Sequence, residues 1–174
     1  MNWAHVHIAL NHVPVMGVIF GFLLLAYAML KKSMELVKVS FAVFVIVTVM
    51  TIPVFLTGHG AEEIVENLPG VTESIIEPHE EAGLLSLVGV AVLGVIGLGG
   101  LSMFRGSKTI PMWLVTISLI FSLAVGGWVA RTANLGGQIR HTEIRSESTV
   151  SMTMEDQREH KEADTEPKRE RRAN

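Results

Sequence analysis

Four long apolar stretches without a charged residue constrain this chain more than any other feature. They cover residues 13–30, 39–57, 82–104 and 110–130, and none of them contains Lys, Arg, Asp or Glu. Each stretch is long enough to cross a hydrocarbon core about 30 Å thick as a helix. We therefore predict an all-α protein whose main part is a four-helix transmembrane bundle, with the lipid bilayer as its surroundings.

The basic residues near the ends of these stretches predict an orientation. Lys31, Lys32 and Lys38 lie around the first connection, and Arg105 and Lys108 lie in the third. Cytoplasmic connections carry an excess of Lys and Arg, so both termini and the second connection are predicted to be extracytoplasmic. Three arginines after the fourth stretch favour the opposite orientation, with the C-terminal side in the cytoplasm: Arg131, Arg140 and Arg145.

The second connection and the tail differ in composition from the four stretches. In residues 58–81, apolar residues recur at helical spacing between glutamates, and Pro69-Gly70 forms a break, which predicts two short amphipathic helices along the membrane surface. Residues 146–174 are nearly free of aliphatic side chains and mix both charge signs, which is typical of disorder. We predict a four-span domain over residues 1–145 and a disordered charged tail over residues 146–174.

Glycines mark the predicted packing faces. Gly17 and Gly21 have the GxxxG spacing that lets two helices approach closely, and the third stretch is rich in glycine. This pattern predicts close packing inside the bundle, and the same faces could join copies of the chain or partner subunits.

Histidines supply the candidate site. In an alternating four-span arrangement, six of the seven histidines collect at one end of the bundle, whichever way the chain is oriented: His5, His7, His12, His59, His79 and His141. On one continuous helix, His5 and His12 are seven residues apart and share a stripe, whereas His7 points elsewhere. These polar groups at the membrane boundary could gather imidazoles from several helices.

Three kinds of chemistry fit such a cluster. A haem b needs two neutral imidazoles, for which His12, His59 and His79 are candidates, and Arg131 and Arg140 could bind its propionates. A non-haem transition metal would be held by nitrogen and oxygen, because the chain has no cysteine; the candidate ligands are His5, His12, His59, His79, His141 and Glu63. Proton or pH chemistry without any cofactor is the third option.

Two resemblances accompany these motifs. The segment HVHIALNHVP at residues 5–14, with TGHGAEE at 57–63 and GGQIRHTEI at 136–144, resembles a broad group of small four-helix bacterial membrane proteins without established function. That resemblance implies the bacterial cytoplasmic membrane. The chain also resembles small four-helix b-type cytochromes, which place paired histidines on facing helices. Its histidines lie at helix ends, so this resemblance implies at most one haem near one surface.

Together these observations predict an electron-transfer protein with haem b or a metal at one membrane face. A quinone or an extracytoplasmic redox protein would be its exchange partner, and no nucleic acid is predicted to bind. The alternative is a non-catalytic accessory subunit that recruits partners through its acidic connection and tail. An enzyme is less expected than either, since no Ser-His-Asp order and no GxSxG elbow is present.

Overall fold

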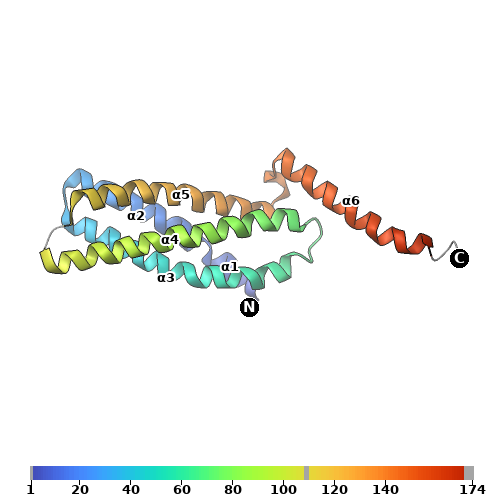
Figure 1. Ribbon diagram of the computed structural model, residues 1–174, viewed down its shortest axis with the longest axis horizontal. Helices are drawn as coiled ribbons and strands as arrows, with labels where there is room; N and C mark the ends of the chain where they lie inside the picture. The colour runs from blue at the N-terminus through green and yellow to red at the C-terminus, as the bar shows by residue number, and fades with distance from the viewer. Residues whose placement is uncertain (1, 108–109, 171–174) are drawn as a thin grey trace.

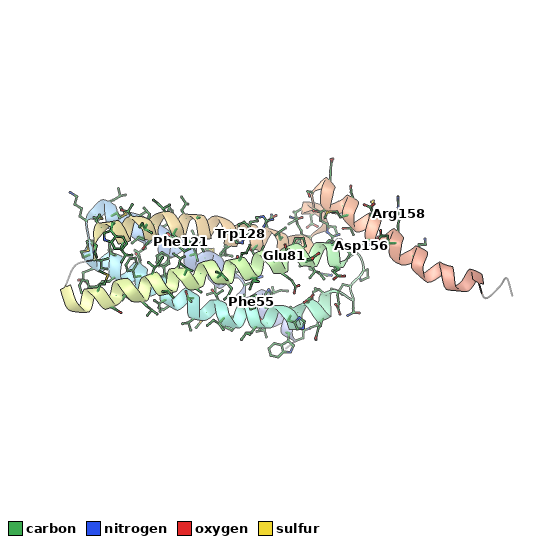
Figure 2. The ribbon with its side chains drawn as sticks, in the orientation of Figure 1. Phe55, Glu81, Phe121, Trp128, Asp156 and Arg158 are labelled. Carbon is green, nitrogen blue, oxygen red and sulfur yellow. The ribbon has the colours of Figure 1, made fainter. Side chains whose placement is uncertain are left out.

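The computed structural model describes residues 2–107 and 110–170, and within these ranges the chain is helical without strands. Four helical stretches are long and apolar enough to cross a membrane: Trp3–Lys31, Met34–Val65, Glu73–Phe104 and Met112–Arg140. They lie along one another as a bundle (Figure 1). Large apolar side chains such as Phe55 and Trp128 remain on the outer surface (Figure 2), where lipid would cover them. The predicted all-α bundle with four potential spans is confirmed.

The first stretch consists of two helices, α1 (Trp3–Leu10) and α2 (His12–Lys31). The side chain of Asn2 caps α1 by accepting a hydrogen bond from the backbone N–H of His5 at 3.0 Å. Pro14 explains the break, because its ring has no N–H for the carbonyl of Leu10 and clashes with that group. As a result, α1 packs against α3 rather than continuing the line of α2.

The connection between the second and third spans differs from its prediction. Helix α3 (Met34–Val65) and helix α4 (Glu73–Ser107) include the two segments expected as separate surface helices. These segments are the last turns of α3 and the first turns of α4, because their apolar side chains, such as Ala61 and Ile75, are buried in the bundle. The break at Pro69-Gly70 is confirmed, and Gly70 has a φ of 78°.

Glycines bring the helices into close contact, as predicted. A Cβ atom built on Gly97 of α4 would lie 2.7 Å from the backbone oxygen of Phe41 in α3, and one on Gly21 of α2 would lie 2.5 Å from the ring of Phe44. These glycines face helices of the same chain. Packing through glycine faces between copies or subunits stays a prediction, and it would have to use positions that face open space, such as Gly99.

The pair Gly97 and Gly99 tests this packing directly. Gly97→Ala is expected to lower the free energy of unfolding by about 1–3 kcal/mol, because a backbone atom cannot move aside as a side chain does. Gly99→Ala meets nothing within 4 Å and should change stability by less than about 1 kcal/mol, in the stabilising direction, because alanine favours helix. Unfolding in detergent, followed by circular dichroism, measures both. Equal losses in the two variants would contradict the packing described.

The tail also differs from its prediction. After α5 (Met112–Arg140) and a short 3-10 turn (Thr142–Ile144), helix α6 spans Glu147–Glu170, where disorder was expected. Residues that favour helix are frequent in α6, and the hydroxyl of Ser146 caps it by accepting from the N–H of Thr149 at 3.3 Å. Its first turns pack on α4, where Thr153 is buried. The rest of α6 extends beyond the bundle (Figure 1), with Arg158 exposed on it and Asp156 partly exposed (Figure 2).

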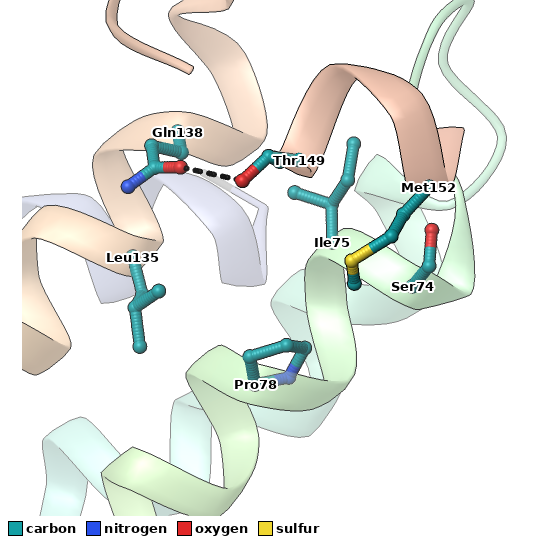
Figure 3. A pocket seen from close by; sticks show the side chains of 7 residues that line it. All are labelled: Ser74, Ile75, Pro78, Leu135, Gln138, Thr149 and Met152. Atoms are coloured by element: carbon teal, nitrogen blue, oxygen red, sulfur yellow. Dashed lines mark hydrogen bonds between the residues drawn. The ribbon is translucent and has the colours of Figure 1, made fainter. Parts of the chain in front are cut away.

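The contact of α6 with the bundle is incompletely filled. A small cavity of about 50 Å³ lies between Pro78 of α4, Leu135 of α5 and Met152 of α6 (Figure 3). At its rim the hydroxyl of Thr149 donates to the side-chain oxygen of Gln138 at 3.4 Å. This space suits a few water molecules and is too small for an organic cofactor.

Arg145 holds this end of the molecule together. Its guanidinium donates to the backbone oxygens of Gln138 at 2.9 Å and Ile139 at 3.1 Å, both in the last turn of α5. It also donates to the backbone oxygen of Gly70 at 3.0 Å, in the connection between α3 and α4. One planar side chain therefore joins the end of α5, the α3–α4 connection and the start of α6.

Arg145→Lys should loosen these three segments, since an ammonium group cannot reach three carbonyls in one fork. Losing charge-assisted hydrogen bonds at a half-buried position should lower the free energy of local opening by about 1–2 kcal/mol. This corresponds to roughly a 5- to 30-fold loss of amide protection. Hydrogen exchange over residues 66–72 and 147–153 measures this loss. Arg140→Lys, at an exposed arginine five residues earlier, is the matched control and should leave the exchange unchanged.

Candidate functional site

Six histidines lie at the end of the bundle where α1, the last turns of α3, the first turns of α4 and the last turns of α5 meet (Figure 1). This gathering was predicted from the alternation of the spans. Which of these histidines approach one another depends on the local course of each helix, and here the structure departs from the prediction.

His7 is fixed against α3. Its Nδ1 atom lies 3.0 Å from the backbone oxygen of Val54 and 3.3 Å from the hydroxyl of Thr57, and the side chain is half-buried. Gly58, the residue after Thr57, lies beside the ring, and a Cβ atom there would be 3.7 Å from Cε1 of His7, which is an ordinary contact distance. Asn11, one turn after His7, has a buried side-chain oxygen without a hydrogen-bond partner.

His79 is fixed between α4 and α5. Its Nδ1 atom lies 3.0 Å from the backbone oxygen of Thr132. A polar network holds the two helices at this level: the hydroxyl of Thr132 donates to the backbone oxygen of Ala82 at 3.1 Å, and the indole N–H of Trp128 donates to the same oxygen at 3.1 Å. Gly136 gives the ring its space, because a Cβ atom there would lie 2.8 Å from Cε1 of His79.

The two imidazoles meet inside the bundle end. The centroids of the His7 and His79 rings are 6.4 Å apart, and their planes are at 87° to each other. A backbone carbonyl only accepts hydrogen bonds, so Nδ1 of each ring carries the hydrogen, and Nε2 of the neutral ring keeps its lone pair. Two oriented imidazoles with free Nε2 atoms are therefore available to one ligand.

His7 is the residue that the sequence interpretation missed. That interpretation treated the first stretch as one continuous helix, on which His5 and His12 shared a stripe. The predicted stripe is confirmed, since His5 and His12 are both exposed, and His7 lies on the other side of the helix, where it faces α3. The available signal was the spacing, because a residue two positions after His5 points about 200° away from it.

His59 lies on the outside of the bundle end, with 81% of its side chain exposed. Its Nδ1 atom is 3.2 Å from a carboxylate oxygen of Glu62, and its Nε2 atom is 4.0 Å from a carboxylate oxygen of Glu63. The ligand atoms of His59, Glu62 and Glu80 all lie within 4.8 Å of one another. Of the predicted haem ligands, therefore, His79 belongs to the inner pair, and His59 belongs to a separate cluster.

The remaining predicted residues lie on the surface. Arg131 is exposed, and its guanidinium carbon is 4.8 Å from the centroid of the Trp128 ring. Arg140 is exposed as well, and a role for either arginine with haem propionates stays a prediction. His141 Nδ1 donates to a carboxylate oxygen of Glu143 at 2.9 Å. Hydrogen bonds from its own backbone N–H and from His141 lower the pKa of the Glu143 carboxyl group.

Comparisons of the chain with protein-family models, with curated proteins and with solved structures find no match.

Proposed function

We propose that this protein is a multi-pass membrane protein that binds haem b through His7 and His79 and transfers single electrons at one face of the membrane. The observation that carries this proposal is the pair of half-buried imidazoles whose ring centroids are 6.4 Å apart. Bound haem supplies an iron that accepts and returns one electron. The residues of the chain hold the ligand rings and shield them from water.

The surroundings of both rings suit metal ligation. Histidines that bind a metal usually donate their other ring N–H to a carbonyl or carboxylate, which fixes the ring and makes the ligating nitrogen more basic. His7 and His79 have this arrangement through the backbone oxygens of Val54 and Thr132. His7 and His79 together would hold one metal ion, because metal–imidazole bonds are about 2.0–2.1 Å long and the two ring centroids are 6.4 Å apart.

The position of the imidazole pair determines which redox partners can reach it. Lys31, Lys32 and Lys38, around the first connection, lie at the opposite end of the bundle, which favours a cytoplasmic location for that end. The imidazole pair then lies near the outer face of a bacterial cytoplasmic membrane, with both termini outside. Quinol within the bilayer, or a redox protein outside, is the partner class that can reach this position.

The test is the visible absorption of protein purified in detergent from cells supplied with haem, recorded before and after dithionite. A haem spectrum that shifts on reduction supports the proposal. A colourless protein that is helical and monodisperse would exclude it.

A second candidate function is a membrane accessory subunit that recruits partners through its acidic connection and tail. The observation that favours it is α6, most of which extends beyond the bundle and carries charged side chains of both signs, such as Asp156 and Arg158 (Figure 2). This function requires no colour and tolerates the loss of His7 and His79, but it depends on α6. Deleting residues 147–174 should therefore abolish partner binding and leave a haem spectrum unchanged.

A further inference from the structure

We infer that His59, Glu62 and Glu80 form a binding site for a divalent transition-metal ion on the outside of the bundle end, separate from the inner pair of imidazoles. The ion would link α3, which supplies His59 and Glu62, to α4, which supplies Glu80. This inference does not depend on haem binding, because it shares no residue with the His7–His79 pair.

Helix geometry separates the two sites. Successive residues on a helix point about 100° apart, so His79 turns into the bundle while Glu80, the next residue of α4, is exposed at its edge. On α3, likewise, Gly58 lies beside the ring of His7, while His59 points outward. His59 and Glu62 are three residues apart and share a face of α3, which brings both toward Glu80.

The spacing of the donor atoms suits one ion. Nδ1 of His59 lies 3.2 Å from the nearer carboxylate oxygen of Glu62, and the three ligand atoms lie within 4.8 Å of one another. Ligands at about 2.0–2.1 Å from a tetrahedral ion are about 3.3 Å apart. Small rotations of the exposed Glu80 side chain would therefore bring the three ligand atoms to this spacing. A fourth coordination position would stay open to water.

The charges also favour a cation. Glu62 and Glu80 come from neighbouring helices and lie in one cluster, so two carboxyl groups face the same point. A bound cation would offset their negative charges. The segment from residue 58 to residue 81 contains seven glutamates and neither Lys nor Arg, so it supplies no basic side chain that could balance the pair.

The outer nitrogen of His59 has the partner expected of a ligating histidine. Its Nε2 atom faces a carboxylate oxygen of Glu63 at 4.0 Å, and a modest rotation brings the two into a hydrogen bond. A carboxylate in this position holds the ring and makes Nδ1 a stronger donor to a metal. One nitrogen and two carboxylate oxygens suit zinc, manganese or iron(II) better than copper(I), which prefers sulfur ligands.

The test uses Co²⁺ and Zn²⁺ with the full chain in detergent, purified without a histidine tag. Saturable binding of one Co²⁺, seen as ligand-field absorption that Zn²⁺ abolishes, is the expected result for the wild type. Glu80→Gln and His59→Ala should weaken binding at least about 100-fold, and Glu63→Gln roughly 10-fold.

Glu81→Gln is the matched control, because Glu81 is exposed on α4 beside Glu80 but lies outside the cluster (Figure 2). It should bind as the wild type does. Absence of saturable binding would overturn the inference, and so would equal loss in Glu80→Gln and Glu81→Gln, which would mean diffuse attraction to an acidic surface. Circular dichroism of each variant confirms that the helices are intact, and the haem spectrum reports independently on the inner pair.

Discussion

Replacing His79 with alanine is expected to abolish the haem spectrum that the proposed function predicts. The alanine side chain offers no nitrogen that could hold the iron in place of the imidazole. His7→Ala should have the same effect, because His7 and His79 together would hold the group. The spectrum of both variants, normalised to protein, measures the result.

His12→Ala is the matched control for this experiment. His12 lies on the same stretch of chain as His7 but is exposed at the start of α2. The spectrum should therefore survive its loss. If His12→Ala removed haem while His7→Ala kept it, the proposed assignment of His7 as a haem ligand would be wrong.

Gly136→Ala is expected to weaken haem retention at least about tenfold without removing a ligand. Its Cβ atom would lie 2.8 Å from Cε1 and 3.1 Å from Nδ1 of His79, so the ring has to leave its position. Moving the ring breaks the hydrogen bond to the backbone oxygen of Thr132 and changes its position relative to His7. Haem transfer to apomyoglobin, followed by absorption, measures the retention.

Gly137→Ala provides the comparison, because its Cβ atom would meet only the end of the Ile144 side chain, at 3.4 Å. Both substitutions place alanine in the same turn of α5, so they share any effect on helix propensity. Equal loss of haem in the two variants would show that the turn, and not the space beside His79, controls retention.

Much of the fold could be predicted from the sequence, because the physical requirements of a membrane act on composition and length. The absence of charge over four stretches predicted four spans, and the glycine spacing predicted close packing. The ends of the helices could not be predicted from the same signals. Whether residues 58–65 continue α3 or lie along the surface depends on the burial of Ala61 among other helices, which is a tertiary contact.

The tail and the candidate site each have a feature that could not be predicted from the sequence. A charged segment cannot form its own core, yet the first turns of α6 gain burial from α4, and the composition of residues 146–174 does not report that contact. At the site, the end of the bundle that gathers the histidines was predictable. The choice of His7 over His12 was not, because it depends on which side of the first helical stretch packs against α3, and that is a tertiary contact.

The inner pair has a consequence for the order of biogenesis. His7 contacts Val54 across 47 positions of the chain, and His79 contacts Thr132 across 53. The first ring leaves the ribosome long before its partner, and the carbonyl that orients the partner arrives with the last span. With haem bound as proposed, a nascent chain would acquire it only after all four helical stretches have associated, which would make haem capture a late step and a checkpoint for complete assembly.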